Sequence, residues 1–185
     1  MIGPWTVKTQ FKSHKLLALT MIDPVSHWFE IVAVPDKEAK TIQNAFDNAW
    51  LSRYPRPTYV RCDNGTEFKN LFKRMCTNFG ITLKPTTSYN PSATGIIERV
   101  HQTIGNMLRT HELEKRELDP KDPWGIFLSS VAWAVRSTYH TTIDATPGQL
   151  VFGRDMILPI HVRTDWAMIK QRRQNLIKKN NEREN

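Results

Sequence analysis

Two carboxylates in the middle of the chain have the placement that metal-dependent chemistry requires. Asp63 directly follows an apolar run, and Glu98 lies in a segment with helical periodicity, with 34 residues between them. A carboxylate beside apolar residues is costly unless a cation or a donor pairs it, and two facing carboxylates commonly hold a divalent metal through oxygen ligands. The pair therefore predicts a metal site, and ordinary solvated carboxylates are the alternative.

The segments around these carboxylates predict how the chain would hold them. Residues 58–62 (TYVRC) favour a short buried strand, and the turn signal Asp63-Asn64-Gly65 follows at once. Carboxyl ends of strands are where α/β folds commonly place ligands. From residue 96 the apolar residues recur at helical spacing, which puts Glu98 on another face of the predicted helix.

The stretch between the two segments, residues 85–95, is composed of Thr, Ser, Asn, Pro and Gly and predicts a mobile loop. Its position just before Glu98 suggests contact with substrate, and an ordinary polar connection is the alternative. Gln102 and Arg109 share the helix face of Glu98.

The remaining patterns are those of one α/β domain. Periodicity predicts further strands over 4–11, 16–22, 28–34 and 81–84 and helices over 36–54, 68–79, 123–135 and 164–177. Residues 137–159 are turn-rich and are expected to wrap the core without regular structure. A chain of 185 residues suits one core with a short appendage.

The charge balance favours a polyanionic partner. Lys and Arg number 26 against 18 acidic residues, which gives a net charge of +8 and a pI near 9.7. A basic but unspecific surface is the alternative. Lys170, Arg172 and Arg173 cluster in the last predicted helix, which is either solvated or in contact with phosphates. No apolar run approaches the ~20 residues of a membrane span, and the start, MIGPWTV, lacks the pattern of a secretion signal.

The two cysteines, Cys62 and Cys76, form no Cys-x-x-Cys pair and no Cys/His cluster. Neither a disulfide framework nor a structural zinc site is expected, and a reducing compartment fits. His101 and His111 lack a ligand partner at i+4, so packing or solvent roles are expected for them.

A collinear series of motifs makes the pattern specific. The chain carries DNGTEF at 63–68, TSYNP at 87–91, Gly95 with Glu98-Arg99, Tyr139-His140, Thr146-Pro147 and Phe152-Gly153-Arg154. Over about residues 3–160 this series closely resembles the catalytic core of retroviral and Ty3/gypsy-type retrotransposon integrases.

The resemblance implies an α/β fold of the RNase H-like type, with a mixed five-stranded sheet flanked by helices. It implies an integrase core over residues 1–160, truncated in its first strand, and a basic helical extension over 161–185. It also implies a D, D, E triad, in which Asp63 and Glu98 are the second and third members and hold Mg²⁺ or Mn²⁺, without zinc. Two such ions activate a water or a DNA 3′-hydroxyl for in-line displacement at phosphorus.

The same resemblance implies partners and contacts. The partners would be DNA, as element ends and as target, and further copies of the chain in a homo-oligomer, with no membrane. A nuclear location follows from that substrate. The residues expected to contact nucleic acid are Asn64, Tyr89, Asn90, Gln102, Arg109, Lys170, Arg172 and Arg173.

Three departures from the family pattern bear on activity. The family's first catalytic Asp lies in a motif like D-x-x-G-P, and on that alignment it would sit immediately before Met1, so an upstream extension is expected to contain it. Asp23 resembles a different acidic position, in a pattern like D-x-x-S, and is only a substitute candidate. The carboxylate spacing is one residue shorter than usual. The family's zinc domain and a chromodomain-like tail are not recognisable.

Three functions are compatible with these observations. The leading one is a Mg²⁺-dependent DNA strand transferase and endonuclease that processes 3′ ends and joins them to target DNA. The second is a catalytically inactive DNA-binding or assembly module derived from a mobile element, since the first Asp is missing. The third, an RNase H-type nuclease, shares the fold, yet the DNGTEF and Tyr-Asn-Pro motifs resemble those of integrases.

Overall fold

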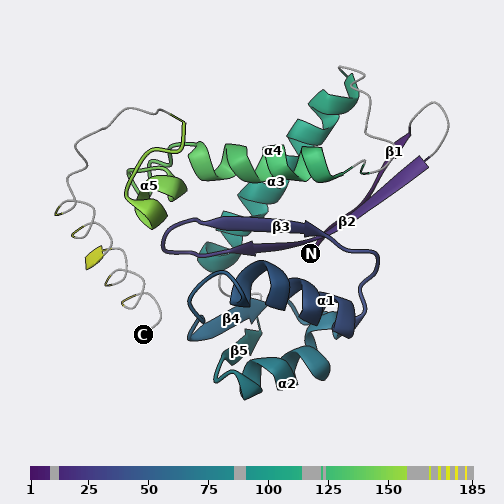
Figure 1. The fold of residues 1–185 in the computed structure, drawn as a ribbon, viewed down its shortest axis with the longest axis horizontal. Coiled ribbons are helices and arrows are strands. Elements are labelled where there is room, and N and C mark those ends of the chain that lie inside the picture. The colour runs from purple at the N-terminus through teal and green to yellow at the C-terminus, as the bar shows by residue number, and fades with distance from the viewer. Residues whose placement is uncertain are drawn as a thin grey trace. The chain divides into compact units, whose positions relative to one another are not determined.

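A computed structural model describes residues 1–8, 13–85, 91–113, 122 and 124–157, and only six separate positions between 158 and 185. The described part is a mixed α/β structure (Figure 1). Contacts divide the chain into two units. The first comprises residues 1–21 and 30–128, and the second comprises residues 22–29 and 129–185.

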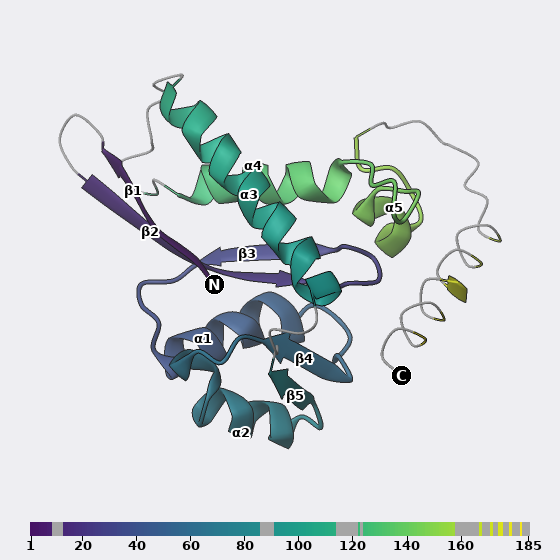
Figure 2. The same cartoon turned by 180° about the vertical axis from the view of Figure 1, so that it is seen from behind.

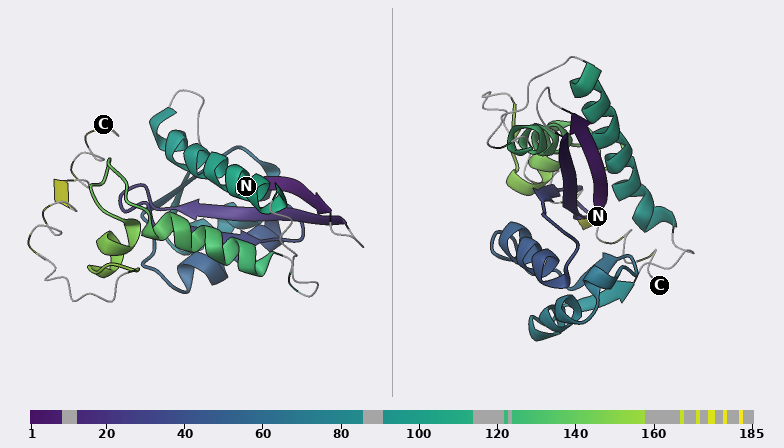
Figure 3. Two further views of the ribbon diagram at one scale, coloured as in Figure 1. Left: turned by 90° about the horizontal axis from the view of Figure 1, so that it is seen from above. Right: turned by 90° about the vertical axis from the view of Figure 1, so that its right-hand side faces the viewer.

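The described strands form two ladders. A three-stranded sheet contains β1 (Ile2–Lys8), β2 (Ser13–Ile22) and β3 (Phe29–Ala33), in that order, and a parallel pair contains β4 (Tyr59–Cys62) and β5 (Thr82–Pro85). β1 runs antiparallel to β2, with Ile2 opposite Ala18. Figures 2 and 3 show β1 lying along β2 from further sides.

The prediction of a single five-stranded sheet is not confirmed, because the described strands pair as three and two. The start of β1 offers a physical reason. Its register shifts between Ile2 and Trp5, where Gly3 has a positive φ of 92° and Pro4 has no backbone N–H to donate. Such an irregular edge, short of donors, is poorly suited to extend a ladder.

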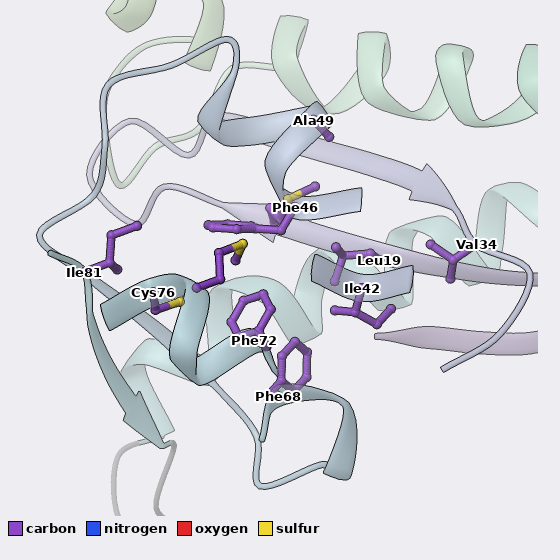
Figure 4. Packing of buried hydrophobic residues seen from close by; sticks show 11 residues of the cluster. Leu19, Val34, Ile42, Phe46, Ala49, Phe68, Phe72, Cys76 and Ile81 are labelled. Carbon is purple, nitrogen blue, oxygen red and sulfur yellow. The ribbon is translucent and has the colours of Figure 1, made fainter. Parts of the chain in front are cut away.

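The core of the first unit lies where α1, α2, β4 and β5 gather (Figure 1). α1 spans Ala39–Phe46 and continues as a π-helical turn, Asp47–Leu51, while α2 spans Leu71–Asn78. The buried cluster, most of which Figure 4 labels, contains Leu19, Met21, Val34, Ile42, Phe46, Ala49, Phe68, Phe72, Met75, Cys76 and Ile81. Met75 and Cys76 on α2 are 5% and 0% exposed, so both serve in packing.

The helix predicted over 68–79 begins later than expected. Residues Thr66–Phe68 form a 3₁₀ turn, and Asn70, with a φ of 46°, separates that turn from α2. Asn tolerates the left-handed region better than most residues do. The prediction of the helix end is confirmed, because Gly80 has a φ of 71° just after it.

The second unit corrects another expectation, that residues 137–159 lack regular structure. Helix α4 (Gly125–Ser137) runs into this unit, and a short helix α5 (Pro147–Phe152) follows. Thr146 Oγ1 accepts from Gln149 N–H, and Gln149 Oε1 accepts from Thr146 N–H, which makes a capping box. The sequence signal was present as Thr-Pro-x-Gln, with Pro147 at the first helical position.

The predicted basic helix over 161–185 stays a prediction. Lys170, Arg172 and Arg173 lie outside the described residues, and the six described positions there, Ala167, Gln171, Gln174, Asn175, Lys178 and Glu182, are each helical. The domain boundary at residue 160 falls in the same undescribed stretch. Within the described part of the chain, no helix is both long enough and apolar enough to cross a membrane.

Candidate active site

Asp63 is placed by the turn that follows β4. Its side chain is exposed, and its Oδ1 accepts a hydrogen bond from Gly65 N–H at 2.9 Å. This local bond fixes the direction of the carboxylate without any other residue. The predicted strand and turn are both present, so the sequence located this side chain at the end of a strand correctly.

A second carboxylate, Glu67, shares this turn and was not predicted as a site residue. It lies in the 3₁₀ turn after Gly65 and is only 9% exposed. A Cβ at position 65 would lie 2.4 Å from Glu67 Oε2 and 2.9 Å from Asp63 Oδ1. The two carboxylates therefore occupy the space that any side chain at position 65 would need. The sequence signal was an acidic residue directly beside the core residue Phe68.

The start of β1 lies beside the Asp63 turn. Burial lowers the pKa of the Met1 α-amino group, and the Asp63 and Glu67 carboxylates act in the opposite direction. Electrostatic interaction of this kind requires the groups to be near one another. The start of the chain and the turn that carries Asp63 therefore belong to one site, although Met1 and Asp63 are 62 positions apart in the sequence.

Glu98 is supplied by α3 (Pro91–Leu113). Its side chain is exposed, whereas Val100 and Ile104 on the same helix are buried, as the predicted periodicity requires. Carboxylate oxygens are the donors that Mg²⁺ and Mn²⁺ prefer, so Asp63 and Glu98 fit such an ion in type. Two carboxylates are, however, fewer ligands than the three of the D, D, E triad. Among the described residues, no three His, Cys, Asp or Glu side chains gather closely enough to hold a metal.

The thiols next to the site are protonated at neutral pH. Burial raises the pKa of Cys62 to about 11, and the Asp63 carboxylate adds to that shift. Burial also raises the pKa of Cys76 to about 11. A thiol in this state is a poor nucleophile and a poor metal ligand, because both roles require the thiolate. The chemistry available here is therefore that of the carboxylates.

His101 is half-buried on α3 and is hydrogen-bonded to Thr20 Oγ1 through its Nε2, at 2.9 Å. Thr20 is buried on β2, so the bond ties α3 to the three-stranded sheet. Burial lowers the pKa of His101 from 6.5 to about 4, and the positive Met1 amino group contributes. The imidazole is thus neutral at physiological pH. The packing role expected for His101 agrees with this position.

The neutral His101 predicts a loss of stability in acid. Between pH 6.5 and about 4 the unfolded chain binds more protons than the native one, so the free energy of unfolding falls as the pH drops through this window. The variant His101→Gln should lose less stability between pH 7 and pH 4.5, as measured by urea unfolding. The matched control, His14→Gln on β2, should keep the wild-type loss. An equal flattening in both variants would contradict this assignment.

Asp23, the substitute candidate for the triad, caps a turn. Its Oδ2 accepts from Ser26 N–H at 2.9 Å and also from the Ser26 hydroxyl, and its Oδ1 accepts from Val25 N–H at 3.4 Å. These bonds hold the connection between β2 and β3. Its carboxylate oxygens are therefore engaged in local structure.

The variant Asp23→Ala should lower the free energy of unfolding by about 1–2 kcal/mol, because it removes charge-assisted bonds to a half-buried turn. Urea unfolding measures this loss. Asp36→Ala, which removes a single bond to Glu38 N–H in an exposed turn, is the control and should cost less. An unchanged unfolding curve for Asp23→Ala, combined with lost metal-dependent activity, would return Asp23 to the triad.

The other predicted contact residues divide into two groups. Asn64, Gln102 and Arg109 are exposed, and Arg109 Nε donates to Gly105 O at 3.4 Å. The rest of the predicted contacts, namely Tyr89, Asn90, Lys170, Arg172 and Arg173, lie outside the described residues. All of these roles stay predictions.

Comparison with known proteins shows which proteins this chain is similar to. The family model of the integrase core domain matches residues 3–91. The retrovirus-related Pol polyprotein from transposon 412 of Drosophila melanogaster is 27% identical over 146 residues, which cover 78% of this chain and 11% of that protein. This chain therefore spans about a tenth of the length of that relative.

Solved structures show the same fold. The catalytic core domain of BIV integrase is similar with a TM-score of 0.61 and 20% identity, covering 75% of this chain and 87% of that one. The HTLV-2 integrase catalytic core domain, solved in complex with magnesium in a trimeric form, has a TM-score of 0.57 and 18% identity, covering 78% and 89%.

Proposed function

Because this chain carries an integrase catalytic core of the RNase H-like superfamily, we propose that it acts in DNA integration. The proposed reaction is polynucleotidyl transfer, in which a DNA 3′ end is processed and then joined to target DNA. One observation carries the proposal. The turn after β4 presents Asp63 beside the start of β1, which is the strand that holds the first carboxylate in the related pattern.

The residues of this chain have separable roles in that reaction. Asp63, directed by Gly65 N–H, and Glu98, on the exposed face of α3, would hold the divalent ion. When bound, magnesium or manganese supplies charge stabilisation at the scissile phosphate and a more acidic attacking hydroxyl group. Asn64, Gln102 and Arg109 are exposed and would contact the DNA strands. Neutral His101 would hold α3 in position against β2 through its hydrogen bond with Thr20.

A second candidate function is favoured by the number of ligands. Because no three candidate ligands gather among the described residues, the chain as given suits an inactive module that binds DNA or assembles with partners. Its net charge of +8 supports DNA affinity in either case. Loss of one metal ligand removes catalysis while it leaves charge-driven binding intact.

The proposed partners are DNA and further copies of the chain, in a nuclear location. The neighbour solved in a trimeric form supports self-association of this fold.

A DNA strand-transfer assay in Mg²⁺ or Mn²⁺ separates the two functions. The proteins to compare are this chain, a chain extended by an aspartate ahead of Met1, and the Glu98→Gln variant of each. Joining by the extended chain that is lost in Glu98→Gln supports DNA integration. DNA binding by all four proteins without joining by any supports the inactive module. Joining that survives Glu98→Gln contradicts the triad.

A further inference from the structure

One face of the β4–β5 ladder carries two cations and an aromatic ring. In the parallel register Tyr59 lies opposite Thr82, and Arg61 lies opposite Lys84. Side chains alternate between the two faces of a strand. Val60, Cys62 and Leu83 pack against the core, so Tyr59, Arg61 and Lys84 lie on the other face, where Lys84 is exposed and the other two are half-exposed.

The ring of Tyr59 holds both cations. Lys84 Nζ lies 4.2 Å from the ring centroid, and Arg61 Cζ lies 5.6 Å from it. Both distances are within the range in which the electron-rich face attracts a cation. The ring thereby orders two long side chains whose like charges repel. A phosphate bound by both side chains would reduce that repulsion.

The two cations lie close to Asp63 along the direction of β4. Tyr59, Arg61 and Asp63 occupy alternate positions along β4 and its end. Two residues of a strand advance by roughly 7 Å, and the phosphates of one DNA strand follow at about 3.4 Å of helix axis. That rise is measured along the axis, and neighbouring phosphates of one strand are farther apart in space, so Arg61 and Lys84 lie about one phosphate away from the phosphate that Asp63 would serve.

We propose that Tyr59, Arg61 and Lys84 form a phosphate clamp that grips the DNA backbone beside the reacting phosphate. The inference rests on the proposed function, whose substrate is DNA, and it names the residues that hold the strand. Arg61 and Lys84 donate to phosphate oxygens, and Tyr59 keeps both side chains ordered before DNA binds. Pre-ordering lowers the entropy cost of each contact. The clamp reads no sequence, because phosphate contacts carry none.

The test is the salt dependence of DNA binding. Fluorescence anisotropy with a short labelled DNA duplex gives the binding constant at several salt concentrations. Each lost phosphate contact lowers the slope of log K against log salt by about 0.9, so the double variant Arg61→Gln, Lys84→Gln should lose about 1.8 from its slope. Tyr59→Leu should keep most of the slope and weaken binding by about two- to five-fold, since only the ordering is lost.

The control removes the same charge from a neighbouring surface. Lys73 and Arg74 are exposed on α2, and the double variant Lys73→Gln, Arg74→Gln should leave the slope near its wild-type value. Thermal melting shows whether each variant is folded.

The outcomes distinguish the clamp from the proposed function. A wild-type slope in the Arg61 and Lys84 double variant, or an equal loss in the α2 control, overturns the clamp while DNA integration stands. Failure of the wild-type chain to bind DNA overturns both. A loss confined to the Arg61 and Lys84 variant supports the clamp, whether or not this chain joins DNA ends.

Discussion

An aspartate added immediately ahead of Met1 is expected to raise the rate of Mg²⁺-dependent DNA strand transfer by about 10³-fold or more over that of this chain. A divalent ion contributes several kcal/mol to the stabilisation of charge in phosphoryl transfer, and ~4 kcal/mol corresponds to about 10³ in rate. In the proposed site Asp63 and Glu98 would supply two carboxylates, and the start of β1 lies beside Asp63, so an aspartate there would supply the third.

Two variants make this experiment specific. An extension of the same length that ends in asparagine adds an amide of nearly the same shape without the charge, and it should leave the rate at the level of this chain. Glu98→Gln in the extended chain should cancel the gain. If the asparagine extension works as well as the aspartate one, the added residue acts by moving the Met1 amino group away from Asp63 and Glu67 rather than as a ligand.

The second large effect concerns stability. Phe72→Ala should lower the free energy of unfolding by about 3–5 kcal/mol, the usual cost of removing a buried aromatic ring and leaving a cavity. Phe72 is 1% exposed, and its ring centroid lies 5.4 Å from that of Phe46 and 5.3 Å from that of Phe68. The ring therefore joins α1, α2 and the 3₁₀ turn that carries Glu67.

Urea unfolding followed by circular dichroism measures the loss. Leu71→Ala, one residue away on α2 and 38% exposed, is the matched control and should cost less than about 1 kcal/mol. A similar loss in both variants would mean that the burial of the Phe72 ring does not set the cost, because alanine is the strongest helix former and helix propensity alone predicts no loss in either variant. Since Phe68 and Phe72 pack together next to the DNGTEF motif, Phe72→Ala should also loosen the Asp63 turn.

The local parts of the site could be predicted from the sequence because each depends on neighbours along the chain. The turn at Asp63, Asn64 and Gly65, the exposed position of Glu98 and the buried stripe of α2 follow from turn chemistry and periodicity. The capping box of α5 follows from the same kind of signal, although we did not predict that helix. Local sequence rules therefore predict individual turns and helices, but not how these elements pack together.

The remaining parts depend on which distant segments meet. Met1 and Asp63 are brought together by the fold, and no spacing in the sequence indicates it. The burial of Glu67 depends on its neighbours in space, and a carboxylate is ordinarily expected in solvent. The division of five strands into two ladders follows from no local pattern in the sequence. Asn70, which delays α2, interrupts a periodic pattern that otherwise continues.

The crowded space at Gly65 limits which residues this turn can accept. Asn64 is exposed, so a substitution there meets little steric resistance. At position 65 even a methyl group would collide with both carboxylates, at 2.4 Å from Glu67 and 2.9 Å from Asp63, although its backbone conformation is one that other residues adopt. Within this turn position 64 has room for other side chains, whereas a side chain at position 65 would require the Glu67 and Asp63 carboxylates to move.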